Sequence, residues 1–113
     1  MNPLNNSPLE VVNQRMQFYN DHNLAAFLAL YSPDIKIYTY PDQLLGQGLD
    51  HMHHLFEPMF QERAVQVDVI KQIVSDSYVI NEEMVSYGED TTRYVSIYEV
   101  RDGHIQSVRF VRG

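Results

Sequence analysis

The spacing of apolar residues in the first third of the chain predicts two helices. Apolar side chains recur at intervals of three and four residues, the period of one helical face, at Leu9, Val12, Met16 and Tyr19. The preceding segment Ser7-Pro8-Leu9-Glu10 is typical of a helix start, with Ser7 as N-cap and Glu10 completing a capping box. Residues 20–23 end this helix, and a second helix is expected over residues 24–31.

From Ile35 onward apolar and polar residues alternate, which is the period of a strand. The pattern predicts strands over residues 35–40, 65–74, 78–87, 93–100 and 105–111. Between the first two strands, residues 46–48 are expected to form a loop and residues 50–60 a third helix, which Pro58 should kink or end. The last two strands are joined by a tight Asp102-Gly103 hairpin turn.

This order of elements predicts an α+β fold in which three helices, all in the N-terminal half, cover one face of a curved sheet. The sheet is expected to be mixed or antiparallel and cone-shaped. Residues 1–8 are expected to be a loose arm and residues 9–113 a single domain. A curved sheet with so few helices tends to leave a hollow, and hollows of this kind are common small-molecule sites.

The composition of the chain disfavours some classes of binding partner and excludes some kinds of site. The 113 residues carry 8 Lys and Arg against 15 Asp and Glu, a net charge of −7, which disfavours nucleic acid and anionic membranes as partners. The chain has no Cys, so a disulfide scaffold, a thiolate metal site and a Cys nucleophile are excluded. No apolar run is long enough for a membrane span and no signal peptide is visible, so we expect a cytoplasmic protein.

Three segments resemble one known superfamily. Residues 27–38 are similar to its apolar helix, acidic turn and strand; residues 48–52 to the Gly-initiated start of its third helix; and residues 98–105 to its last hairpin. The chain thus resembles the SnoaL-like, nuclear-transport-factor-2-like superfamily over residues 9–112, with the steroid Δ-isomerase-like cone fold. The resemblance implies this fold, but its members include enzymes, binders and scaffolds.

The groups that work in two enzyme branches of this superfamily are changed here. In the steroid Δ-isomerase branch the base corresponds to Thr39 before Tyr40-Pro41, the helix tyrosine to Arg15 and the oxyanion-binding Asp to Ser96. In the epoxide hydrolase branch the Arg and the two Asp correspond to Glu83, Val85 and Phe110. Neither activity is therefore expected.

The resemblance and strand parity together place a set of side chains inside the cone. Those expected from the sheet are Thr39, Glu83, Val85, Tyr94, Ser96, Tyr98, Val108 and Phe110. Those expected from the helices are Met16, Tyr19, Met52, Leu55 and Met59, with Arg15 near the mouth. The set predicts a pocket lined by Tyr and Met that suits an apolar, ring-containing small molecule.

Glu82 and Glu83 are adjacent in a strand and must point to opposite faces. Parity together with the aligned enzyme positions places Glu83 in the cone, where desolvation among apolar walls raises the pKa of a carboxyl group and suits general acid or base work. We treat Glu83 as the candidate acid/base and Tyr19 or Tyr40 as the hydroxyl donor. The alternative is that Glu83 forms a structural ion pair with Arg15 or Arg93.

The remaining polar clusters are assigned weaker roles. His51, His53 and His54 lack the usual spacing of a helical metal pair, so no metal and no cofactor are expected. Tyr38, Tyr40, Tyr94 and Tyr98 provide either a stacking wall for a ligand ring or ordinary cross-strand packing.

Two functions follow. The first is a small-molecule-binding protein, or a cofactor-free enzyme with isomerase-like or hydrolase-like chemistry. The second is a non-catalytic dimeric module that associates through its sheet. An open cone favours the first and a filled cone the second. A homodimer through the sheet is expected in either case, because the second face of the sheet is unusually rich in Tyr, Val and Ile.

Overall fold

The computed structural model describes residues 7–112 and contains three helices and one sheet. The helices are α1 (Pro8–Asp21), α2 (Leu24–Ala29) and α3 (Leu49–Glu62). The strands are β1 (Tyr31–Thr39), β2 (Gln43–Gln47), β3 (Val65–Ser75), β4 (Tyr78–Tyr87), β5 (Asp90–Arg101) and β6 (His104–Arg112). Residues 1–6 of the predicted arm lie outside the described residues, and Ser7 and Pro8 belong to the start of α1.

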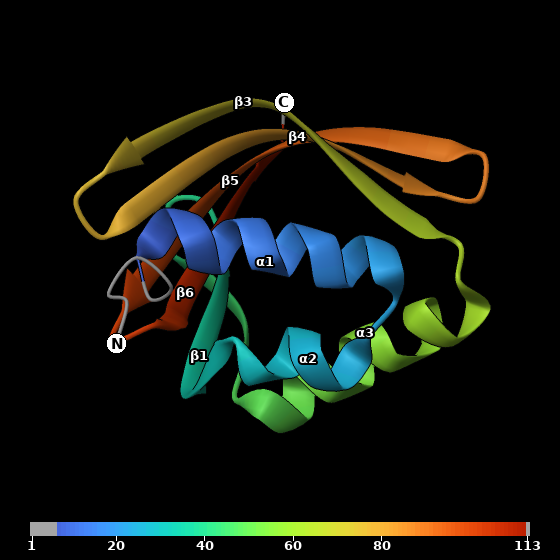
Figure 1. Cartoon of the computed structure of the whole chain (residues 1–113), viewed down its shortest axis with the longest axis horizontal. Helices are drawn as coiled ribbons and strands as arrows, with labels where there is room; N and C mark the ends of the chain where they lie inside the picture. The colour runs from blue at the N-terminus through green and yellow to red at the C-terminus, as the bar shows by residue number, and fades with distance from the viewer. Residues whose placement is uncertain (1–6, 113) are drawn as a thin grey trace.

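The six strands form one sheet in the order β2-β1-β6-β5-β4-β3. All neighbouring pairs are antiparallel except β1 and β6, which are parallel, so the sheet is mixed. The helices lie on one side of the curved sheet, where α1 runs beneath β3 and β4 and is followed by α2 and α3 (Figure 1). The predicted α+β class, with a curved sheet and three helices, is confirmed. No helix in residues 7–112 is long and apolar enough to cross a membrane.

The helix starts follow the local sequence. The side chain of Ser7 accepts a hydrogen bond from the backbone N–H of Glu10 over 3.2 Å, with proline in the first turn of α1. Asn23 caps α2 in the same way through Ala26. The Ser7 cap agrees with the sequence prediction.

The ends of two helices differ by two residues from those predicted. The second helix ends at Ala29 rather than at Tyr31, which instead begins β1. The third helix continues past Pro58 to Glu62. Pro58 is exposed, so the backbone carbonyl that it leaves without a partner can be solvated by water.

The segment around Gly46 was expected to be a loop, and most of it is strand β2. Residues 43–47 pair antiparallel with the end of β1, with one register shift between Ile37 and Tyr38. Leu44 and Leu45 are both exposed, so no alternation between buried and exposed positions marks this strand in the sequence.

The amide side chain of Asn20 connects helix α1 to the backbone of the edge strand β3. Asn20 donates from Nδ2 to the carbonyl of Val67 over 3.0 Å and accepts the N–H of Val67 at Oδ1 over 2.7 Å. The side chain thus occupies both backbone groups of Val67 on the open edge of the sheet. This contact holds α1 across the concave face and positions the side chains described next.

Candidate functional site

The strand register arranges the concave face of the sheet in rows. One row runs across four strands through Asn81, Ser96, Phe110 and Thr39. The adjacent row contains Val79, Tyr98, Val108 and Ile37. Polar side chains therefore lie in the middle of a face that is otherwise apolar.

Glu83 lies on this concave face and is buried, with 1% of its surface exposed. Its carboxylate accepts three hydrogen bonds: Ser96 Oγ donates to Oε1 over 3.0 Å, and Asn81 Nδ2 and Tyr98 OH donate to Oε2 over 3.2 and 2.8 Å. Three donors compensate for much of the cost of burying a charged carboxylate. Glu83 and its three donors all come from β4 and β5.

Arg15 of α1 faces this cluster and is also buried, with 4% exposed. Its Nε donates to the hydroxyl of Tyr31 over 2.9 Å. Three aromatic rings surround the guanidinium, with their centroids between 5.1 and 5.3 Å from Cζ: Tyr19, Phe27 and Tyr98. Cation–π contacts of this kind stabilise a charged guanidinium that has been removed from water.

The electrostatics keep Arg15 charged. Burial acts to lower the pKa of the Arg15 guanidinium, but Tyr31, Tyr98 and Glu83 outweigh that effect and raise the pKa above its usual value. The cone therefore holds a permanent cation close to a carboxylate that already has its own donors.

The tyrosines of the cone stay protonated. Burial raises the pKa of the Tyr98 phenol well above its usual value, and the Glu83 carboxylate adds to the effect while Arg15 opposes it. Burial likewise raises the pKa of Tyr31 and of Tyr19. Each of these hydroxyl groups is thus a hydrogen-bond donor over the whole physiological range of pH.

A chain of amides supports Glu83 from behind. Gln72 of β3 donates from Nε2 to Oδ1 of Asn81 over 2.9 Å, and Asn81 in turn donates to Glu83. The same nitrogen of Gln72 lies 3.2 Å from Oδ1 of Asn13 on α1. Gln72 therefore fixes the orientation of the Asn81 amide, so that its nitrogen points at the carboxylate.

The residues expected in the pocket divide into two groups. The deep group belongs to the core and is buried: Arg15, Met16, Tyr19, Met52, Glu83, Ser96, Tyr98 and Val108. The outer group is only partly buried or is exposed: Thr39, Leu55, Met59, Val85, Tyr94 and Phe110. The rings of Tyr94 and Phe110 pack against each other with centroids 5.8 Å apart.

Several expected roles do not fit the positions observed. Tyr40 is 55% exposed beyond the end of β1, and Tyr19 packs among aromatic rings, whereas Tyr98 donates to Glu83. Tyr38 lies on the outer face beneath Arg109, with 4.3 Å between Cζ and the ring centroid, so it is not part of the cone wall.

The ion pairs expected for Glu83 are not found in residues 7–112. Arg93 instead pairs with Glu82 on the outer face, with 2.8 Å between Nε and Oε2. Glu83 helps to raise the pKa of Arg15 through its charge, but the two side chains lie beyond the 4 Å limit of an ion pair. Glu83 is thus held by neutral donors.

Each histidine of α3 lies beside another residue of the chain. His53 lies 3.4 Å from Glu57 one turn later, and the ring of His51 packs directly against Gly46 of β2. Sequence reasoning singled out these histidines but missed Tyr31, Asn81 and Gln72. Of these, only Asn81 carries a signal in the sequence, because it shares strand parity with Glu83.

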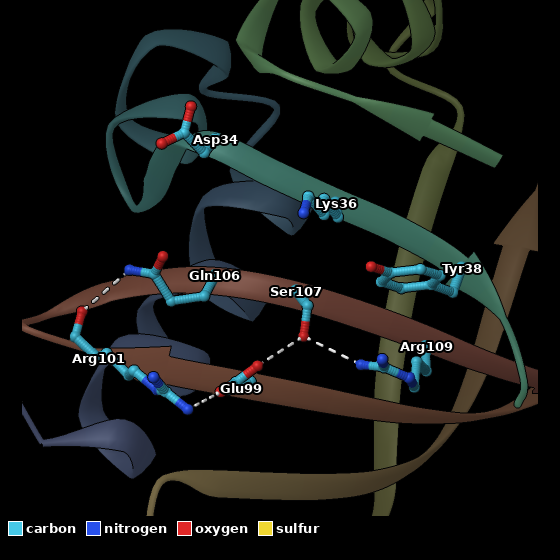
Figure 2. A pocket seen from close by; sticks show the side chains of 8 residues that line it. All are labelled: Asp34, Lys36, Tyr38, Glu99, Arg101, Gln106, Ser107 and Arg109. Carbon is cyan, nitrogen blue, oxygen red and sulfur yellow. Dashed lines mark hydrogen bonds and ion pairs between the residues drawn. The ribbon is translucent and has the colours of Figure 1, made fainter. Parts of the chain in front are cut away.

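A second concave feature lies on the outer, helix-free face of the sheet. This outer groove has a volume of about 360 Å³ and is lined by polar and charged side chains of β1, β5 and β6 (Figure 2). Further along the same face, Ile73, Ile80 and Val95 line an apolar hollow of about 190 Å³ together with Lys71 and Glu82.

Comparison with protein families identifies the domain. Residues 12–108 match the model of the SnoaL-like domain. The chain belongs to this family. No curated protein is similar enough to count as a relative.

Solved structures show the same fold at low sequence identity. A cystatin-fold protein from Novosphingobium aromaticivorans shares 16% identity with a TM-score of 0.85, covering 94% of this chain and 98% of that one. A designed binder of 17-OHP shares 17% with a TM-score of 0.80, covering 95% and 92%. An epoxide hydrolase from M. tuberculosis shares 15% with a TM-score of 0.75, covering 94% and 82%. At these identities the SnoaL-like chain shares the fold of these proteins, and its chemistry has to be argued from its own residues.

Proposed function

We propose that this SnoaL-like protein binds an apolar, ring-containing small molecule in its cone, with an oxygen atom of the ligand directed at Arg15. The observation that supports the proposal most is the state of the Arg15 guanidinium. It is buried, yet within residues 7–112 its only acceptors are the hydroxyl of Tyr31 and, at 3.7 Å, the sulfur of Met16. A guanidinium has five N–H donors, so most of them have no acceptor among these residues and remain available to a ligand acceptor.

The outer group of side chains supports the proposal that the main part of the ligand is apolar. Its side chains lie toward the ends of β1, β4, β5 and β6 and on α3, beside the buried cluster. Aromatic and Met side chains adapt to a ring system, and the polar cluster then fixes its orientation. The designed 17-OHP binder, which shares the fold, fits this proposal.

For a catalytic role, the same cluster supplies the acid/base chemistry of a cofactor-free reaction. Glu83 is the candidate acceptor of a proton, and Arg15 would stabilise negative charge that develops on a ligand oxygen. We assign the hydroxyl donor to Tyr98, in place of Tyr19 or Tyr40, because its hydroxyl lies 2.8 Å from Glu83.

Native mass spectrometry of freshly purified protein tests the proposal. We expect a co-purifying small molecule in the wild type, and its loss in Glu83→Gln and Arg15→Met, with the fold retained by circular dichroism. Glu82→Gln is the matched control, since Glu82 lies on the outer face and pairs with Arg93. Equal loss of the ligand from Glu82→Gln and Glu83→Gln would contradict the site.

The second candidate function is a non-catalytic homodimeric module that associates through the outer face of the sheet. The buried state of Tyr98, Met52 and Met16 favours it, because these side chains fill the cone from inside. Large apolar side chains on the outer face and the edge strand also favour it, with Ile73 61% exposed and Tyr78 40% exposed. Sedimentation at tens of micromolar distinguishes the two candidate functions. A monomer at this concentration would exclude the dimeric module, but it would not contradict ligand binding in the cone.

A further inference from the structure

The hydrogen-bond acceptors and donors inside the cone are used to different extents. The Glu83 carboxylate already accepts three hydrogen bonds, and Oδ1 of Asn81 accepts one from Gln72. The donors around Arg15, in contrast, largely lack acceptors in residues 7–112. A ligand that enters the cone therefore meets free donors at Arg15 and a carboxylate that is already occupied.

The free donors belong to Arg15 and to two tyrosines. Nε of Arg15 donates to Tyr31 and Nη1 to the sulfur of Met16, which leaves three of the five N–H groups of a guanidinium unused. Within residues 7–112, the hydroxyl of Tyr31 accepts from Arg15 but donates to no side chain, and the hydroxyl of Tyr19 forms no hydrogen bond. We call these N–H and O–H groups the donor set.

The members of the donor set lie close together. Nε of Arg15 is 2.9 Å from the hydroxyl of Tyr31, and Cζ is 5.2 Å from the ring centroid of Tyr19. The positive charge of Arg15 also opposes the rise in pKa that burial causes at both tyrosines, as expected for phenols beside a guanidinium. One polar group of a ligand can therefore accept hydrogen bonds from several members of the set.

Open space reaches the donor set. Among the residues that the structure describes, Nδ1 of His22 is the only side-chain nitrogen or oxygen that is fully enclosed and has no hydrogen-bond partner. Nη2 of Arg15 and the hydroxyl of Tyr19 also have no partner there, so neither atom is fully enclosed. Both residues are 4% exposed, which fits a narrow opening.

We propose that the ligand of the cone carries a carboxylate group that binds Arg15, Tyr19 and Tyr31, while its ring system lies among the outer group of side chains. This inference rests on the ligand-binding function proposed above and names the chemical class of the ligand. A carboxylate offers about four acceptor positions and matches the fork of a guanidinium. A ketone oxygen offers half as many, and an alcohol adds a donor for which the set has no acceptor.

The charges in the cone are compatible with such a ligand. Glu83 is held by neutral donors and lies beyond 4 Å from Arg15, so it does not occupy the guanidinium. A ligand carboxylate at hydrogen-bond distance from Arg15 gains more from this contact than it loses by repulsion from a more distant Glu83. The reason is that Coulomb energy falls with distance and that three donors already compensate the charge of Glu83.

Three naphthalene compounds with different polar groups test the proposed class. The probes are 2-naphthoate, 2-acetonaphthone and 2-naphthylmethanol, and their dissociation constants are measured by calorimetry at neutral pH. We expect naphthoate to bind about tenfold or more tightly than the ketone, because its hydrogen bonds are charge-assisted. The alcohol should bind most weakly. A ketone or alcohol that binds as tightly as naphthoate would overturn the carboxylate and leave ligand binding in the cone intact.

Two variants remove members of the donor set. Tyr19→Phe keeps the ring and should weaken naphthoate about three- to tenfold. Arg15→Met should abolish the preference for naphthoate over the ketone, and Tyr19→Phe still tests the donor set if Arg15→Met does not fold. Tyr78→Phe is the matched control, because it removes the same hydroxyl at a position that is 40% exposed, and it should leave all affinities unchanged. Equal affinity for naphthoate in Tyr19→Phe and the wild type would remove Tyr19 from the site.

A molecule that co-purifies with the wild type provides a second test. Its mass after release and methyl esterification should increase by one CH₂ group for each carboxylate. A co-purified molecule without a carboxylate would overturn this inference and support the proposed function. The absence of any co-purified molecule, together with no binding of the three probes, would overturn the proposed function itself.

Discussion

The phenol of Tyr98 connects the two charged groups of the cone. Its hydroxyl donates to Oε2 of Glu83 over 2.8 Å, and its ring centroid lies 5.3 Å from Cζ of Arg15. The buried Tyr98 side chain thus donates a hydrogen bond to the Glu83 carboxylate and turns its ring face toward the Arg15 guanidinium. Any ligand that reaches this position meets a site whose charges balance.

The stability of the protein should depend on pH in the alkaline range. Burial raises the pKa of Tyr19, Tyr31 and Tyr98, so these phenols remain protonated in the folded state when they ionise in the unfolded state, near pH 10. The stabilisation they provide is complete below about pH 10 and is lost as the pH rises further, by about 1.4 kcal/mol per pH unit for each tyrosine.

Urea denaturation at a series of pH values between about 8 and 11 checks this prediction. Tyr98→Phe should reduce the alkaline slope of the free energy of unfolding. The exposed Tyr78→Phe is the control and should leave the slope as in the wild type. An unchanged slope in Tyr98→Phe would show that this phenol does not stay protonated in the fold.

We predict no steroid Δ-isomerase activity. The groups that correspond to the base and to the two oxyanion donors of that branch are Thr39, Arg15 and Ser96. Loss of a general base costs about two to four orders of magnitude in rate, and loss of an oxyanion donor about two to three more. Turnover of a Δ5-3-ketosteroid well above the solution rate, followed by absorbance, would refute the correspondence.

Removing the amide of Asn20 should loosen α1 from the edge of the sheet. Asn20→Ala leaves both backbone groups of Val67 without this partner, and we expect a loss of about 1–3 kcal/mol in the free energy of unfolding. Gln17→Ala, at an exposed position of the same helix, should change the value by less than about 0.5 kcal/mol. Chemical denaturation of both variants compares them directly, and equal effects would contradict the role of Asn20.

The effect of a side chain at position 46 on stability should depend on the presence of the His51 ring. A Cβ at position 46 would overlap the ring of His51 and force that side chain to move, so Gly46→Ala should destabilise the fold by about 1 kcal/mol. In a His51→Ala background the same substitution should be neutral or stabilising, because the obstructing ring is gone. A thermodynamic cycle over the four proteins measures this coupling, and additive effects would count against it.

The sequence was most informative where one face of an element is buried. The bounds of β4 were predicted exactly as Tyr78–Tyr87, and the parity that placed Glu83 inside and Glu82 outside agrees with their burial. Strand β2 was missed because both of its leucines are exposed, which removes the alternation that marks a strand. Tyr31 was assigned to a helix because its apolar ring continues the helical period of the preceding residues.

The candidate site was predictable only within single strands. Asn81 and Glu83 share a strand and a face, so their proximity follows from parity. Tyr98 does not lie opposite Glu83 in the register, where Tyr94 is found, and its hydroxyl reaches the carboxylate diagonally. Contacts of this kind depend on sheet curvature and side-chain direction, which a period-two pattern does not encode.

The parallel pairing of β1 with β6 has a consequence for biosynthesis. β6 is the last of the strands in residues 7–112, yet it lies in the middle of the sheet, between β1 and β5. Until β6 has left the ribosome, the β1–β2 hairpin has no strand through which it can join the β3–β4–β5 meander. The concave face that buries Arg15 is then divided in two. Because the contacts that unite these halves join segments distant in sequence, the nascent chain must keep its apolar surfaces soluble until β6 has emerged.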